Sequence, residues 1–190
     1  MNTAIIVSII VVAALVILFG LFLWASYTSL KMLRSRVDEA WRDIESQLEQ
    51  RAELVPVFVG AVQKHASHEQ AVLRSAETAR AETLAATTPQ EATAAENHLQ
   101  QALRGVLAVA DGFPKLAASA DFLEQQSELG QSEERLQTSR RFYNGGVREY
   151  NTKLGVFPNT MFARREGFER REFFEVADGT TKAAPPRVQF

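Results

Sequence analysis

Near its start the chain has a long run without charged residues. A long stretch follows in which apolar positions recur among charged ones every three or four residues. The run covers residues 4–25 and contains no charged side chain. At about 1.5 Å per residue, a helix of this length extends about 33 Å, enough to cross a hydrocarbon core of about 30 Å. No later stretch is as long and as apolar. The pattern therefore predicts a single transmembrane helix.

A cleaved signal peptide is the alternative interpretation of this run. Such a peptide needs a basic first segment, a shorter apolar core and small residues before the cleavage site. Residues 1–3 carry no basic side chain, and Leu23 occupies the place of the first small residue before Ala25. We therefore expect an uncleaved anchor, with Trp24 and Tyr27 at the membrane interface.

Behind the run, apolar positions recur every three or four residues and predict four helices. The first is long and is expected to kink at Pro56 without ending there. A second helix is expected from Ser67, acting as N-cap, to about Ala86. Residues 88–91 form a capping box with proline at the first helical position, so a third helix begins there and ends at Asp111. The apolar positions of the first helix are Leu30, Leu33, Val37, Ala40, Trp41, Ile44, Leu48, Ala52, Val55 and Val59.

The fourth predicted helix carries apolar residues at intervals of seven, the spacing of a helix that packs against other helices. Asp121 is its expected cap and Pro158 its expected end. Residues 144–146, Asn-Gly-Gly, are also a hairpin signal. The interval of seven passes through them without a slip, so the helix is expected to continue at a cost of about 1 kcal/mol for each glycine. The apolar positions are Phe122, Leu129, Leu136, Tyr143, Tyr150 and Phe157.

These elements predict an all-α fold: an N-terminal transmembrane helix followed by an antiparallel four-helix bundle with long first and fourth helices. The expected organisation is a short segment at 1–3, the anchor at 4–25, the bundle at 26–158 and an aromatic and charged tail at 159–190.

Composition narrows the possible functions. The net charge of −2 and the pI of about 6.0 do not suit nucleic-acid binding, which usually needs a basic surface. The chain has no cysteine, which excludes disulfides, thiolate metal sites and cysteine nucleophiles. Basic residues follow the apolar run but do not precede it, so we expect the bundle on the cytoplasmic side, with the periplasmic side as the alternative. These residues are Lys31, Arg34, Arg36 and Arg42.

Four stretches together resemble the bacterial LemA family. They are LRSRVDEAWRDIESQLEQRAELVPVFV from Leu33, HE at His68, FPKL from Phe113, and DFLEQQSELGQSEERLQTSRRFYNGGVREYNTKLGVFP from Asp121. The resemblance implies a membrane helix, a four-helix bundle and a non-enzymatic role at the bacterial cytoplasmic (inner) membrane. Relatives often lie beside genes for membrane zinc peptidases, which makes a membrane peptidase one partner that the resemblance implies, and one branch serves magnetosome assembly.

Charged residues near the membrane end of the bundle form the first candidate site. In an antiparallel bundle they face one another, either as ion pairs worth about 0 to 1 kcal/mol each or as a polar groove that docks a partner helix or strand. In the second interpretation, Tyr143 and Tyr150 supply contact area. The charged residues are Asp38, Glu39, Arg42 and Asp43 on the first helix and Arg140, Arg141, Arg148 and Glu149 on the fourth.

The tail and two histidines are the remaining candidates. Arginines and glutamates balance in residues 162–175, so the expected anchors are Phe162, Phe168, Phe173 and Phe174, which either fold back on the bundle or bind the membrane or a partner. Residues 188–190, Val-Gln-Phe, are a hypothetical docking peptide. His65 and His68 are spaced as two metal ligands, but the sequence offers no third ligand and histidines at a helix end are usually caps. We expect no metal and no cofactor.

The sequence therefore favours a non-enzymatic scaffold or adaptor that binds the lipid bilayer and other envelope proteins. A self-associating protein that organises the membrane is the alternative. A metal-dependent hydrolase centred on the two histidines is a remote one.

Overall fold

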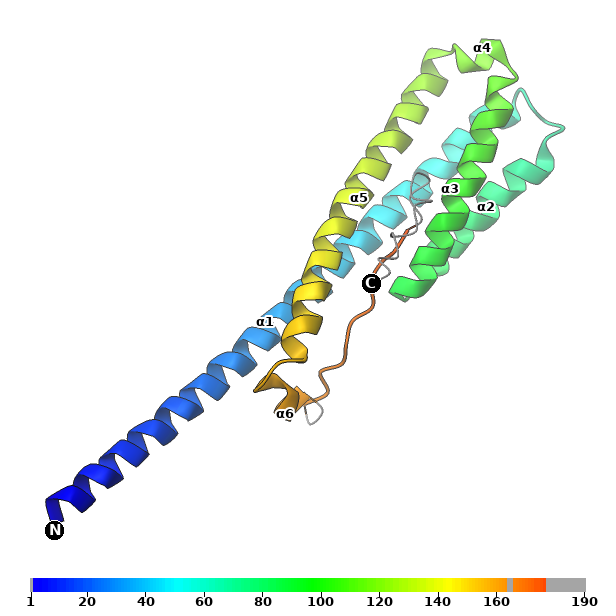
Figure 1. Ribbon diagram of the computed structural model, residues 1–190. Coiled ribbons are helices and arrows are strands. Elements are labelled where there is room, and N and C mark those ends of the chain that lie inside the picture. The colour runs from blue at the N-terminus through cyan, green and yellow to red at the C-terminus, as the bar shows by residue number, and fades with distance from the viewer. Residues whose placement is uncertain (1, 164–165, 177–190) are drawn as a thin grey trace, which may run out of the picture. The chain divides into compact units, whose positions relative to one another are not determined.

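The computed structural model describes residues 2–163 and 166–176, and within them the regular secondary structure is all helix, with no strand (Figure 1). The chain divides into two compact units. The first unit is Met1–Trp41 with Asn144–Arg171, and the second is Arg42–Tyr143 with Glu172–Phe190. The helices are α1 (Asn2–Gln63), α2 (Gln70–Ala85), α3 (Pro89–Asp111), α4 (Pro114–Ala117), α5 (Ala120–Leu154) and α6 (Asn159–Ala163).

The apolar run forms the beginning of α1, and the other described residues leave it uncovered. Its large apolar side chains from Ile5 to Trp24, apart from Leu23, are 51% to 69% exposed. Among the described residues, α1 is the one helix whose length and composition would let it span a bilayer. An unpacked apolar helix of this kind is what the predicted anchor requires.

In the first unit, the apolar residues of α1 that follow the run still recur every three or four positions, and they are buried. Leu30, Leu33 and Val37 are at most 5% exposed, as are Val147 and Tyr150 from the end of α5. A Cβ atom on Gly146 would lie 3.4 Å from Val37 Cγ2, so this glycine marks a close approach of α5 to α1. Helix α5 runs through residues 144–146 without a turn, which confirms the helix over the hairpin.

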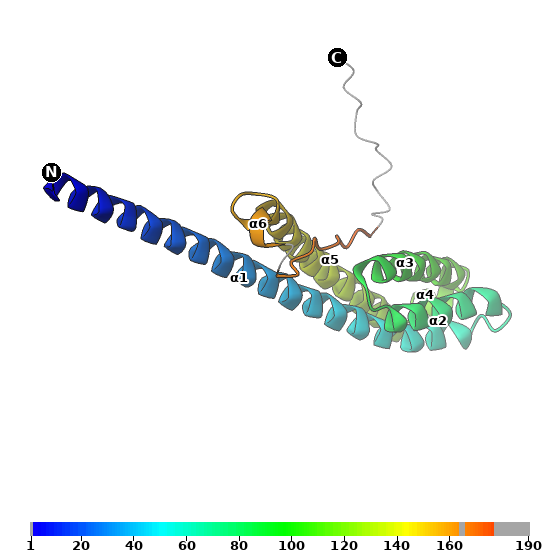
Figure 2. The same ribbon diagram turned by 90° about the horizontal axis from the view of Figure 1, so that it is seen from below.

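In the second unit, helices α1, α2, α3, α4 and α5 all contribute to one hydrophobic core. Figure 2 shows α2 and α3 running side by side over this part of the chain. Helix α1 passes through Pro56 and ends at Gln63, so the proline does not stop it. The central core residues are Val55, Phe58, Val62, Leu73, Leu99, Leu103, Val106 and Phe122.

The capping box at the start of α3 is confirmed, whereas two other predicted starts are wrong. The Thr88 side chain accepts from Glu91 N, and the Glu91 carboxylate accepts from Thr88 N at 3.2 Å. Helix α2 begins at Gln70 instead of after Ser67, because residues 64–69 form hydrogen-bonded turns that end α1. Helix α5 is capped by Ser119 instead of Asp121: Ser119 Oγ accepts from Phe122 N at 3.4 Å.

Five of the six apolar positions that recur at intervals of seven along α5 are buried, as predicted. Phe122, Leu129, Leu136, Tyr143 and Tyr150 are buried. Phe157 is 58% exposed, because α5 ends at Leu154 and the chain turns before it reaches this residue. The hypothetical docking peptide at 188–190 lies outside the described residues.

Candidate functional site

The charged residues that the sequence singles out are divided between the two units. Asp38, Glu39 and Arg148 belong to the first unit, and Arg42, Arg140 and Arg141 belong to the second. Asp38 Oδ1 accepts a hydrogen bond of 2.7 Å from Arg171 Nη2, and Asp38 Oδ2 lies 4.0 Å from Arg34 Nε. The tail therefore supplies the main partner of Asp38. Glu39, Arg42, Arg141 and Arg148 are exposed.

The two tyrosines do not form a contact surface, and this part of the sequence interpretation is wrong. Tyr143 is 2% exposed and Tyr150 is 1% exposed. In the second unit, Tyr143 Oη donates to Glu172 O at 2.8 Å. In the first unit, burial raises the pKa of Tyr150. The reason is the interval of seven, which places both tyrosines on the core side of α5.

The described part of the tail packs against helices of its own chain. In the first unit, the Phe168 ring meets Tyr27 edge-on with 5.9 Å between ring centroids, and Arg34 lies 5.7 Å above it. In the second unit, Phe174 is fully buried and Arg140 Nη1 donates to Val176 O at 2.8 Å. Phe168 and Phe174 are therefore core residues. Phe173, at 37% exposed, is the one tail candidate with a described side chain that still faces solvent.

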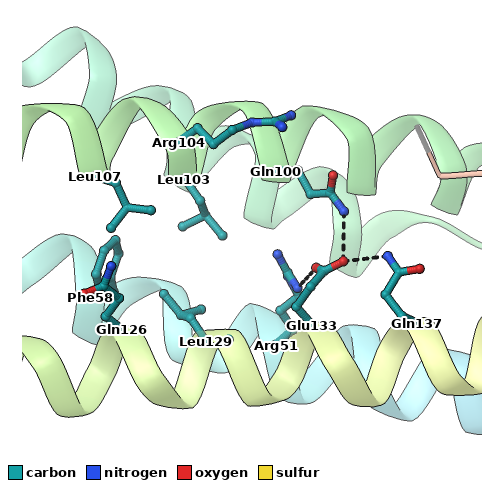
Figure 3. Close-up of a pocket in the computed structure, with 11 residues that line it drawn as sticks. Arg51, Phe58, Gln100, Leu103, Arg104, Leu107, Gln126, Leu129, Glu133 and Gln137 are labelled. Atoms are coloured by element: carbon teal, nitrogen blue, oxygen red, sulfur yellow. Dashed lines mark hydrogen bonds and ion pairs between the residues drawn. The ribbon is translucent and has the colours of Figure 1, made fainter. Parts of the chain in front are cut away.

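A buried ionic cluster in the second unit was missed by sequence reasoning. Arg51 on α1 is 5% exposed and Glu96 on α3 is fully buried. Arg51 Nε lies 3.4 Å from Glu96 Oε1, and Arg51 Nη1 also pairs with Glu133 of α5. Figure 3 shows Gln100 and Gln137 beside Glu133, whose Oε1 accepts from them at 3.2 Å and 2.6 Å.

Glu96 is the most perturbed acid of this cluster. Burial raises the pKa of its carboxyl from 4.5 to about 7, the nearby charge of Glu133 raises it as well, and the positive charge of Arg51 opposes both. No described residue forms a hydrogen bond of normal geometry with either carboxyl oxygen of Glu96, although the nearby Gln100 side chain also lowers this pKa. The side chain therefore sits near the balance between its neutral and charged forms, away from solvent.

A groove of about 600 Å³ opens beside the cluster (Figure 3). One end of the groove is apolar and is lined by Phe58, Leu103, Leu107 and Leu129. The other end holds the polar cluster. The lining positions recur every three or four residues along α3 and α5, so the groove runs along these two helices. On α3 they are Gln100, Leu103, Arg104 and Leu107, and on α5 they are Gln126, Leu129, Gly130, Glu133 and Gln137.

The histidines do not form a metal site in the part of the chain that the structure describes. His65 and His68 are exposed in the turns between α1 and α2. No group of three or more histidine, aspartate or glutamate side chains converges there, or elsewhere among the described residues. His98 Nδ1 lies 2.7 Å from Glu82 Oε2 at the surface.

The missed cluster did leave a signal in the sequence. Arg51 lies three residues after Leu48 and four before Val55, so it occupies an apolar position of its helix. Glu96 lies three residues before Leu99, and Glu133 lies three before Leu136. One basic and two acidic residues at core positions of three helices predict a buried ion pair.

The burial of Glu96 predicts a dependence of stability on pH. Because folding raises this pKa, the folded chain holds the proton more tightly than the unfolded chain does. The contribution of Glu96 to the free energy of unfolding is expected to be largest below pH 4.5 and to fall by about 3 kcal/mol as the pH rises through about 7. Urea unfolding of the full chain in detergent, followed by circular dichroism, measures this slope. Glu96→Gln should flatten it, and an equal slope in that variant would contradict the assignment.

Comparison with known proteins identifies the family. Two similar proteins are Magnetosome protein MamQ 2 and Magnetosome protein MamQ 1, both from Paramagnetospirillum magneticum (strain ATCC 700264 / AMB-1). Each is 27% identical over 95 residues, which is 50% of this chain and 35% of the relative. The match therefore spans about a third of the length of these curated relatives. The pattern of the LemA family matches residues 40–190, well over half of the chain. The protein belongs to the LemA family.

Proposed function

We propose that this protein is a non-enzymatic scaffold or adaptor that is anchored in the bacterial cytoplasmic membrane and binds other envelope proteins. In this proposal the apolar part of α1 crosses the bilayer once, and the remaining helices form an antiparallel four-helix bundle on its cytoplasmic side. The exposed apolar side chains of residues 5–24 support the anchor. The four basic residues that follow it support the cytoplasmic side.

The groove between α3 and α5 carries the proposal of a binding role. Its lining on α5 extends from Gln126 to Gln137, about 16 Å of helix, which corresponds to about three turns of a bound helix. A groove with one apolar end and one polar end suits an amphipathic helix, whose apolar face lies in the groove and whose polar residues meet the cluster. We propose that the occupant is such a helix from another membrane protein.

Several features support binding over catalysis. Glu96 has a raised pKa, but it is fully buried, so a substrate in solvent does not reach it. Glu133 is held by Arg51, Gln100 and Gln137. These contacts occupy both oxygens of the Glu133 carboxylate.

A bulky residue at Gly130 separates binding from folding. Gly130 lines the groove, and a Cβ atom built on it meets nothing within 4 Å. Gly130→Phe should therefore place its Cβ atom without a clash and add its ring to the lining of the groove, and loss of the glycine favours the helix by about 0.5 kcal/mol. We expect capture of the partner by the tagged full chain, from membranes treated with a cross-linker, to fall at least about tenfold, which corresponds to about 1.4 kcal/mol.

Gly145→Phe is the matched control for this experiment. Gly145 is also a helical, exposed glycine of α5 with nothing within 4 Å of an added Cβ, but it does not line the groove. The control should keep the partner. Equal capture by both variants would show that the groove is not the binding surface.

A further inference from the structure

The link between α5 and α6, together with the first turn of α6, exposes three large apolar side chains. Val156 is 54% exposed, Phe157 is 58% exposed and Met161 is 68% exposed. They lie within six consecutive residues of the first unit, around the start of α6. Apolar side chains gathered in this way usually mark a contact with a membrane or with another protein.

Hydrogen bonds hold this segment beside α1 at the end of the apolar run. Asn159, which is 2% exposed, lies at the centre of them. Ser26 Oγ donates to Asn159 Oδ1 at 2.7 Å, and Asn159 Nδ2 donates to Lys153 O at 2.8 Å. Lys153 Nζ in turn donates to Ser29 Oγ. The start of α6 is therefore attached to α1 one residue beyond Ala25, the last residue of the run.

This attachment fixes the level of the apolar side chains along the anchor. Trp24, which is 69% exposed, lies one residue before the end of the run, where an interfacial aromatic is expected. Ser26 lies two residues further, about 3 Å along the helix axis. The interfacial layer on each side of a bilayer is about 5 to 8 Å thick. A segment bonded to Ser26 thus lies at the level of this layer when the run crosses the membrane.

We propose that Val156, Phe157 and Met161 insert into the interfacial layer of the same bilayer that the apolar run crosses, as a second membrane contact beside the anchor. This inference rests on the proposed membrane anchoring. Lipid is the occupant because the patch continues the apolar surface of the run at the level where that surface meets the headgroups. The contact also accounts for Phe157, which follows the interval of seven but lies outside the protein core.

Fluorescent labels on single cysteines test this contact directly. Since the chain has no cysteine, each introduced thiol is the only one to react. The full chain is reconstituted into phosphatidylcholine and phosphatidylglycerol vesicles, with an environment-sensitive label at V156C, F157C or M161C. Lipids that carry a nitroxide at a shallow depth should quench the fluorescence of these labels at least about twice as strongly as that of a label at L123C. The reason is that interfacial side chains lie about 5 to 10 Å deep in the membrane. Leu123 is a matched control, 51% exposed, in the second unit.

A label at L15C separates the two proposals. Leu15 lies in the middle of the run, so a nitroxide near the bilayer centre should quench it if the anchor spans the membrane. Quenching at L15C with no more quenching at F157C and M161C than at L123C would overturn the second contact and leave the anchor standing. Absence of quenching at L15C would overturn both.

Discussion

Aspartates at three positions of the apolar run are expected to release the protein from the membrane. Val12, Leu15 and Phe19 are 60%, 61% and 51% exposed, and no described part of the chain covers them. An aspartate near the centre of a membrane helix costs about 3 kcal/mol, so the triple variant Val12→Asp, Leu15→Asp, Phe19→Asp should lose roughly 9 kcal/mol of insertion free energy. That loss is enough to shift the full chain from the membrane pellet to the supernatant after extraction with alkaline carbonate.

Two aspartates at other exposed apolar positions control for general effects of the charge. Leu84 and Leu123 are 47% and 51% exposed, and both lie outside the run. The variant Leu84→Asp, Leu123→Asp should stay in the membrane pellet, as the unmodified chain should. If the triple variant resisted carbonate as well as this control does, the run would not be the anchor.

Loss of Arg51 is expected to destabilise the second unit strongly. Arg51→Met leaves Glu96, which is fully buried, beside Glu133 with no cation between them. Removal of one partner from a buried ion pair costs about 3 to 5 kcal/mol, because the remaining charge stays desolvated. The loss should be larger at high pH than at low pH, since Glu96 carries its proton below a pKa of about 7. Urea unfolding of the full chain in detergent, at about pH 5 and about pH 8, measures both effects.

Arg104 provides the matched control on the rim of the same groove. It is exposed, and Arg104→Met should change the free energy of unfolding by about 0.5 kcal/mol or less. The double variant Arg51→Met, Glu96→Met should recover most of the lost stability, because an apolar pair replaces the ionic one. A single variant as stable as the Arg104 control would show that the cluster does not hold the unit together.

Local signals predicted most of the helices. The apolar period predicted the long first helix and the long last helix, and the capping box at Thr88 set the start of α3. The starts of α2 and α5 were predicted wrongly, because a single residue that can cap a helix is a weaker signal than a capping box. The side chain of Ser67 can cap a helix, yet the turns that close α1 use the residues around it. Phe157 continues the interval of seven, but the helix had already ended at Leu154.

The candidate site was harder to predict, because exposure depends on packing that a sequence does not contain. Tyr143 and Phe174 are aromatic residues that suit a binding surface, and the fold buries both. Arg51 and Glu96 were overlooked because charged residues are usually solvated, although each stands at an apolar position of its helix. The groove requires side chains from α1, α3 and α5, which only the folded chain brings together.

Photo-cross-linking in living cells tests the central claim that the groove binds another membrane protein. A photoreactive amino acid replaces Gln126, which lines the groove, or Glu128, which is exposed on α5 but does not line it. We predict that the photoreactive amino acid at position 126 repeatedly cross-links to one envelope protein, which mass spectrometry of the membrane fraction identifies. The same amino acid at position 128 should not cross-link to it. Adducts at Gln126 that contain only a second copy of this chain would contradict the adaptor and support self-association instead.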